Sequence, residues 1–237
     1  MPVQKKSFLE SETPLLTNYS YGLSIMSYSV KEIFYTLQGE GLHSGRPSVF
    51  CRFSGCNMWT GKEEDRNSSS CYFCDTDFVG TDGSGGGSFD SAASLATAIA
   101  REWPKTSTCG KKYVVFTGGE PLLQLDKDII GAVHNQAFEV GIETNGTLPV
   151  PDGIDWICVS PKAGAALEVK AGSELKLIFP LKGLEPEKFE KLDFEHFYLQ
   201  PMDGSNREEN IKLAVRYCME HPKWKLSLQA HKLLGIR

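Results

Sequence analysis

The sequence predicts an α/β fold built as a partial (β/α) barrel. Short apolar strands alternate with helical segments along most of the chain, and this alternation is typical of a parallel sheet or a (β/α) barrel. Fewer than eight such units fit into 237 residues, so a barrel would be partial. The sequence contains no internal repeat.

The N-terminal segment differs from the rest of the chain. Residues 1–26 are polar, rich in Ser, Thr and Glu, and lack periodicity. We expect them to form a flexible extension, with Met26 as an alternative start. Residues 27–237 are expected to form a single domain.

Strands and helices are expected to alternate from residue 48 onward. Apolar runs predict strands over 48–53, 113–116, 138–143, 156–160, 174–179, 196–199 and 225–229. Helical spacing of apolar residues predicts helices over 91–103, 121–136 and 206–220. Asp90 is the candidate N-cap of the first helix. Residues 55–87 are loop-like, and Gly83 to Gly87 have the composition of a flexible linker.

Composition excludes several classes of protein. Hydrophobic residues make up 41% and charged residues 23%, which excludes disorder as the main state. Since no apolar run approaches the roughly 18 residues of a membrane helix, we expect no membrane association. The net charge is −5 without a basic stripe, so we expect no nucleic-acid partner.

Cysteine usage favours a reducing compartment. The seven cysteines are too few and too unevenly spaced for a disulfide scaffold. The first 26 residues also lack the continuous apolar region of a signal peptide. We therefore expect a cytoplasmic protein, in which cysteines are more often metal ligands or redox groups than bridges.

Three cysteines share one loop after the 48–53 strand. Cys56, Cys71 and Cys74 follow the pattern C-x14-C-x2-C. Thiolates on such a loop can hold an iron–sulfur cluster, and three ligands leave one iron of a cubane open. A structural zinc site would need a fourth ligand, for which His43 is the nearby histidine. Alternatively, Cys71 and Cys74 are incidental and Cys56 is a small core residue.

A glycine pair marks a second candidate site. Thr117-Gly118-Gly119-Glu120-Pro121 joins a buried strand to a helix. The glycines allow backbone groups to approach a ligand, Glu120 can accept from an amine, and Pro121 fixes the helix start. A plain tight turn explains the same residues.

Together, the cysteine loop and this junction resemble the radical S-adenosylmethionine (SAM) superfamily. The resemblance implies a [4Fe–4S] cluster held by the three cysteines, with SAM bound to its open iron. It also implies that the Gly-Gly-Glu-Pro segment contacts the SAM amino group. The spacing departs from the superfamily's common C-x3-C-x2-C.

Further motifs, in order, are similar to those of the 7-carboxy-7-deazaguanine synthase family, over residues 27–237. They lie at 34–41, 74–76, 143–146, 160–162, 200–203 and 229–232. This resemblance implies a radical SAM lyase of queuosine and 7-deazapurine biosynthesis. The implied reaction contracts 6-carboxy-5,6,7,8-tetrahydropterin to 7-carboxy-7-deazaguanine with loss of ammonia, and SAM is regenerated. Ala230 stands where the family usually has Thr.

The resemblance also implies roles for individual residues. Cys56, Cys71 and Cys74 would hold the cluster and Thr76 a Mg²⁺ ion, with no catalytic residue beyond the cluster and SAM. The implied SAM contacts are Phe73, Asp75, Gly119, Ser160, Pro161, Lys162, Gln200, Pro201, Met202 and Asp203. The implied substrate contacts are Leu37, Gln38, Gly39, Arg52, Thr117 and Arg237.

Two of these substrate contacts carry their own chemistry. Arg52 offers a planar fork for the substrate carboxylate, and its alternative is a surface salt bridge. The contact from Arg237 is its terminal carboxylate, a main-chain group, so the identity of residue 237 should matter little.

Some assignments stay open. Glu143 and Asn145 can contact substrate, SAM or a helix end, and His231 has no assigned role. The family leads us to expect a homodimer and a reductase or flavodoxin-type electron donor. The competing hypotheses are another radical SAM enzyme, such as a glycyl-radical activase, and a non-catalytic zinc or iron–sulfur module.

Overall fold

The computed structural model describes residues 27–105 and 110–237. Within these residues nine strands form one sheet in the order β3-β1-β2-β4-β5-β6-β7-β8-β9. Strand β1 is antiparallel to β2 and β3, and the strands from β2 to β9 are mutually parallel. The strands are β1 (Tyr28–Leu37), β2 (Pro47–Phe53), β3 (Gly87–Phe89), β4 (Lys112–Gly118), β5 (Phe138–Thr144), β6 (Trp156–Val159), β7 (Ala171–Phe179), β8 (Asp193–Pro201) and β9 (Trp224–Leu226).

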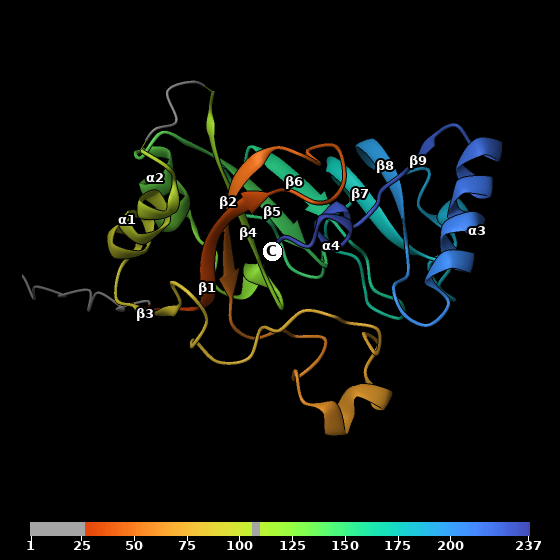
Figure 1. The fold of residues 1–237 in the computed structure, drawn as a ribbon, viewed down its shortest axis with the longest axis horizontal. Helices are drawn as coiled ribbons and strands as arrows, with labels where there is room; N and C mark the ends of the chain where they lie inside the picture. The colour runs from red at the N-terminus through yellow and green to blue at the C-terminus, as the bar shows by residue number, and fades with distance from the viewer. Residues whose placement is uncertain (1–26, 106–109) are drawn as a thin grey trace, which may run out of the picture.

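The α-helices flank this sheet. They are α1 (Ala92–Glu102), α2 (Lys127–His134), α3 (Arg207–Glu220) and α4 (Ala230–Leu234), with short 3₁₀ turns η1 (Glu63–Ser68), η2 (Pro121–Leu123) and η3 (Pro186–Lys188). Figure 1 shows α1 and α2 at one end of the sheet, α3 at the other, and α4 between them. Since β3 and β9 are the two ends of the sheet, the predicted partial barrel is confirmed.

All seven predicted strands are present, but the cysteine loop follows the second strand of the chain rather than the first. Tyr28–Leu37 forms β1, which the sequence analysis did not assign. A register shift between Val30 and Glu32 breaks the apolar alternation there, and such a bulge hides a strand from pattern analysis.

Helix ends also differ from the prediction. Ser91, not Asp90, caps α1, because its side chain accepts from the Ser94 N–H. The predicted 121–136 helix is split into η2 and α2, since the Asp126 carboxylate caps α2. The predicted last strand ends at Leu226 and the chain then turns into the unexpected helix α4.

The glycine stretch at 83–87 is not a linker, so that expectation is wrong. The Gly83 N–H donates to the Lys31 carbonyl oxygen over 3.0 Å, and the Ile33 N–H donates to the Ser84 carbonyl oxygen over 2.8 Å. A Cβ on Gly86 would lie 2.2 Å from the same Lys31 oxygen. Glycine is needed here because the segment packs directly against the β1 backbone.

The loop between β1 and β2 lies at the N-terminal ends of the parallel strands. The His43 ring packs against Trp156 at a tilt, with ring centroids 4.2 Å apart, and meets the Tyr113 ring edge-on at 5.2 Å. Arg46 lies 3.8 Å over the Tyr113 ring and pairs with Glu139 at 2.7 Å. Because residues 43–46 of this loop fill one end of the partial barrel, we expect a ligand site toward the opposite end, where the parallel strands finish.

The core has two main parts. One lies between α1, α2 and strands β1, β2, β4 and β5, and includes Trp103. The other lies between α3 and strands β6 to β9, and includes Trp224. None of the helices in the described residues is long and apolar enough to cross a membrane.

Candidate active site

The cysteine loop folds around its own small core. The Trp59 and Phe78 rings pack edge-to-face, with centroids 5.6 Å apart, against Cys71. Arg66, in η1, lies 4.2 Å over the Trp59 ring and donates to the carbonyl oxygens of Tyr72 and Cys74 over 3.0 and 2.7 Å. The long spacing between the first two cysteines thus contains a turn that folds back to hold the second and third.

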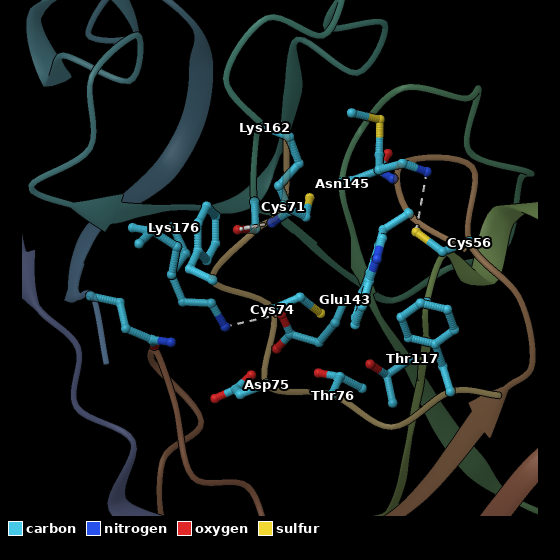
Figure 2. A pocket seen from close by; sticks show the side chains of 18 of the residues that line it. Cys56, Cys71, Cys74, Asp75, Thr76, Thr117, Glu143, Asn145, Lys162 and Lys176 are labelled. Carbon is cyan, nitrogen blue, oxygen red and sulfur yellow. Dashed lines mark hydrogen bonds and ion pairs between the residues drawn. The ribbon is translucent and has the colours of Figure 1, made fainter. Parts of the chain in front are cut away.

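The three cysteines line one cavity, which we call the cysteine cavity (Figure 2). All three are free thiols. The space in the cavity, with its open mouth included, is about 1050 Å³. Burial is the main cause that raises the pKa of the Cys71 thiol, to about 11.

The donor set fits a cluster better than a single ion. In residues 27–105 and 110–237, no three His, Cys, Asp or Glu side chains converge on one metal position. A cubane binds each thiolate through a different iron, so its ligands surround a space rather than a point. His43 packs against Trp156 and Tyr113 at the far end of the strands, so the fourth ligand suggested for zinc is misplaced. Cys109, which is not one of the three loop cysteines, lies outside the residues that the structure describes.

The residues implied for SAM gather in this cavity. Gly119 ends the β4 junction, Ser160 and Lys162 follow β6, and the 200–203 segment ends β8, as expected for the carboxyl ends of parallel strands. Lys162 Nζ donates to Ser160 Oγ over 2.8 Å. Of the ten residues, Pro161 alone is missing from the lining, which includes Phe73, Asp75, Gly119, Ser160, Lys162, Gln200, Pro201, Met202 and Asp203.

The glycine pair is required by close packing. A Cβ on Gly118, whose φ is +156°, would lie 2.5 Å from the Phe53 carbonyl oxygen. A Cβ on Gly119 would lie 2.5 Å from the Cβ of Cys56. The two glycines therefore let the cysteine loop lie directly against the end of β4.

The Glu120 side chain ties neighbouring strand ends together. Its side chain is fully buried and accepts from the Asn145 N–H and the Thr144 hydroxyl, each over 2.7 Å, and from the Leu122 N–H over 3.0 Å. Burial raises the pKa of this carboxyl group. These three donors leave acceptor capacity on the carboxylate, so the expected contact with a ligand amine stays a prediction.

A second cavity, the C-terminal cavity, adjoins the first. It contains every residue implied for the substrate: Leu37, Gln38, Gly39, Arg52, Thr117 and Arg237. The stacked rings of Phe34 and Phe50, 5.6 Å apart, also line it. The residues that line both cavities are Glu40, Asp75, Thr76, Thr117, Glu143 and Gln229. The two cavities therefore share a wall, and Thr76 stands in it.

A buried charge network lies at this shared wall. Lys176 is 3% exposed, and its Nζ lies 2.7 Å from a Glu40 oxygen and 3.0 Å from a Glu143 oxygen. Burial opposes its charge, but surrounding groups, Glu143 and Glu40 among them, raise its pKa well above the ordinary value. Gln38 donates to Glu143 over 3.2 Å, so the network links the loop after β1 with β5 and β7.

Lys176 and Glu40 were not predicted as site residues from the sequence. The available signal was the pair Glu174 and Lys176 in an otherwise apolar strand, two residues apart and therefore on one face. Of the residues left open, Glu143 lines both cavities, whereas Asn145 lines the cysteine cavity alone and donates to Asn57.

Helix α4 lines the C-terminal cavity and contacts residues that line the cysteine cavity. His231 lines the C-terminal cavity and lies so close to Gly39 that a Cβ there would be 2.2 Å from its Nδ1 atom. Lys232 pairs with Asp75 and, at 2.6 Å, with Asp203. The end of the chain thus contacts two of the segments implied for SAM.

Comparison with known proteins identifies the family. The chain is 62% identical over 211 residues to the 7-carboxy-7-deazaguanine synthase of Bordetella pertussis, an alignment that covers 89% of this chain and all of that protein. The chain belongs to the 7-carboxy-7-deazaguanine synthase family. No protein-family model matches it.

Other members support the assignment. The 7-carboxy-7-deazaguanine synthase of Bradyrhizobium diazoefficiens is 59% identical over 212 residues, covering 90% of this chain and all of that protein. The crystal structure of QueE from Escherichia coli superposes with a TM-score of 0.61 at 25% identity, covering 87% of this chain and 95% of that one. The resemblance stated from the sequence motifs is thereby confirmed.

Proposed function

We propose that this chain is a radical SAM lyase that contracts 6-carboxy-5,6,7,8-tetrahydropterin to 7-carboxy-7-deazaguanine and releases ammonia. Family membership at about 60% identity over whole relatives supports the activity. The adjoining cysteine and C-terminal cavities support it independently, because the chemistry needs a cofactor and a substrate in contact. Residues 27–237 would act as a single domain.

The cysteine cavity is the proposed cofactor site. Cys56, Cys71 and Cys74 would hold a [4Fe–4S] cluster, which together with bound SAM supplies the radical that starts the reaction. Lys162, held by Ser160, would pair with the SAM carboxylate, and the 200–203 segment would cover the cofactor.

The C-terminal cavity is the proposed substrate site. Arg52 would bind the substrate carboxylate, and the Phe34 and Phe50 rings offer an apolar surface to the pterin. The terminal carboxylate of Arg237 would accept from the 2-amino group and N3–H of the pterin. Thr76, in the shared wall, would bind Mg²⁺ together with substrate and water oxygens.

We further propose a cytoplasmic homodimer that takes its electrons from a reductase or flavodoxin-type donor. A sparse set of free thiols fits a reducing compartment.

The experiment is anaerobic incubation of the iron- and sulfide-reconstituted protein with SAM, dithionite and the carboxytetrahydropterin. We expect a product with the mass of 7-carboxy-7-deazaguanine and an equal amount of ammonia. Arg52→Lys should raise KM for the pterin while KM for SAM stays unchanged, because Lys lacks the planar fork. A cluster-loaded protein that binds SAM but leaves the pterin unchanged would overturn the proposal.

A further inference from the structure

The C-terminal residue is held along one face of β1. The Arg237 guanidinium pairs with a Glu32 oxygen at 2.5 Å and lies 4.8 Å from the centre of the Phe34 ring. The Thr36 hydroxyl donates to the Arg237 main-chain oxygen over 2.7 Å. Residues 32, 34 and 36 are two apart in a strand and so share a face. Three contacts, two of them from the side chain, therefore fix the end of the chain.

The other oxygen of Glu32 holds Arg52. Glu32 and Arg52 are opposite one another in the β1–β2 register, and Arg52 Nε donates to Glu32 Oε1 over 2.9 Å. Both side chains are largely shielded from solvent, at 14% and 18% exposed. Because this bond uses Nε, the two terminal nitrogens of the Arg52 guanidinium remain available for a bidentate carboxylate contact.

We propose that Glu32 is a positioning residue that fixes both polar ends of the substrate site, and that the Arg237 side chain positions its own terminal carboxylate through Glu32. The proposal rests on the proposed function. It revises the expectation that the identity of residue 237 matters little.

The two contacts of Glu32 should affect the binding of two ligands differently: a pterin with the 6-carboxylate and a pterin without it. Arg52 would meet the 6-carboxylate, whereas the chain end would meet the pyrimidine ring. Weakening the Arg237 contact should therefore reduce binding of any pterin. Removing the Glu32 charge weakens its contact with Arg52 as well, and should therefore also reduce the preference for a pterin with the 6-carboxylate over one without it.

The test is equilibrium dialysis of the reconstituted protein against 6-carboxypterin and against pterin without the carboxylate. Arg237→Ala keeps the terminal carboxylate and should weaken both ligands by about tenfold, the loss expected for one charge-assisted contact. Glu32→Gln should weaken 6-carboxypterin more than pterin. In the Arg237→Ala background, Glu32→Gln should cost less than it does alone, since the two residues act through one contact. SAM affinity should not change in any variant.

Ile236→Ala is the matched control, because this exposed side chain lies outside both cavities and should leave both affinities as they are. Wild-type affinities in Arg237→Ala, or fully additive losses in the double variant, would overturn the inference while leaving the proposed function intact. Failure of the wild-type protein to bind 6-carboxypterin would overturn the proposed function and this inference with it.

Discussion

The Asn145 N–H donates to a buried Glu120 oxygen over 2.7 Å, and this bond ties the end of β5 to the end of β4. The second Glu120 oxygen accepts from Thr144 over the same distance. Asn145 in turn donates to Asn57, the residue after Cys56. Glu120 thus fixes the wall of the cysteine cavity without lining it.

Glu120→Gln should lower the free energy of unfolding by about 1–3 kcal/mol. Both carboxylate oxygens accept hydrogen bonds, and a carboxamide would place its NH₂ group against one of the buried donors. Urea denaturation followed by circular dichroism measures the change. Glu168→Gln, at an exposed position, should be neutral. Equal stability of the two variants would contradict a buried structural role for Glu120.

Arg66→Ala should weaken cluster retention. Loss of two side-chain bonds to the cysteine loop costs about 1–3 kcal/mol, which lowers the ratio of correctly folded to misfolded loop by roughly 5- to 150-fold. The measurement is iron per chain after reconstitution and anaerobic desalting. Arg101→Ala changes an exposed arginine on α1 and serves as control. Full iron retention in Arg66→Ala would show that the loop does not depend on this side chain.

Cys71→Ala should leave a folded protein that cannot hold an intact cluster, because only three thiolates are proposed as ligands. Cys218→Ala should retain full iron, since Cys218 packs on α3 beside the second part of the core. Iron and sulfide analysis with the visible absorption spectrum distinguishes the two. Equal cluster loss in both variants would reject the ligand assignment.

Stability should fall at acid pH through His43. Burial, followed by the nearby Arg46 charge, lowers the pKa of His43 below its ordinary 6.5. A histidine with a lowered pKa in the fold contributes stability above the unfolded value of 6.5, and this contribution is lost as pH falls through the folded pKa. His43→Phe keeps an aromatic ring against Trp156 and should remove this part of the acid dependence. Unfolding free energies between pH 5 and 7.5 with the same slope in both proteins would contradict this.

The candidate site was easier to predict from the sequence than the elements at the edges of the fold. Uninterrupted apolar runs such as Tyr113 to Phe116 predicted the central strands, because a strand buried on both faces needs them. Strand β1 escaped prediction because of its bulge, and α4 because five residues show too little periodicity. The cysteine spacing and the ordered motifs pointed to residues that line the two cavities.

The contacts behind those residues were not predictable. Glu32 and Arg237 are 205 residues apart in sequence, and they meet because the chain end after α4 lies against β1. In the sequence, Arg66 is one of several charged residues in a polar loop. Its contacts with Trp59 and Cys74 are visible only in the structure. Such positioning contacts depend on tertiary structure, which a linear pattern does not encode.

The measurement that tests the proposed function most directly is the ratio of 7-carboxy-7-deazaguanine formed to SAM consumed by the reconstituted enzyme. The account predicts many product molecules for each SAM consumed, one ammonia for each product, and little 5′-deoxyadenosine, because SAM is regenerated. No product, or one SAM consumed for each product, would contradict it.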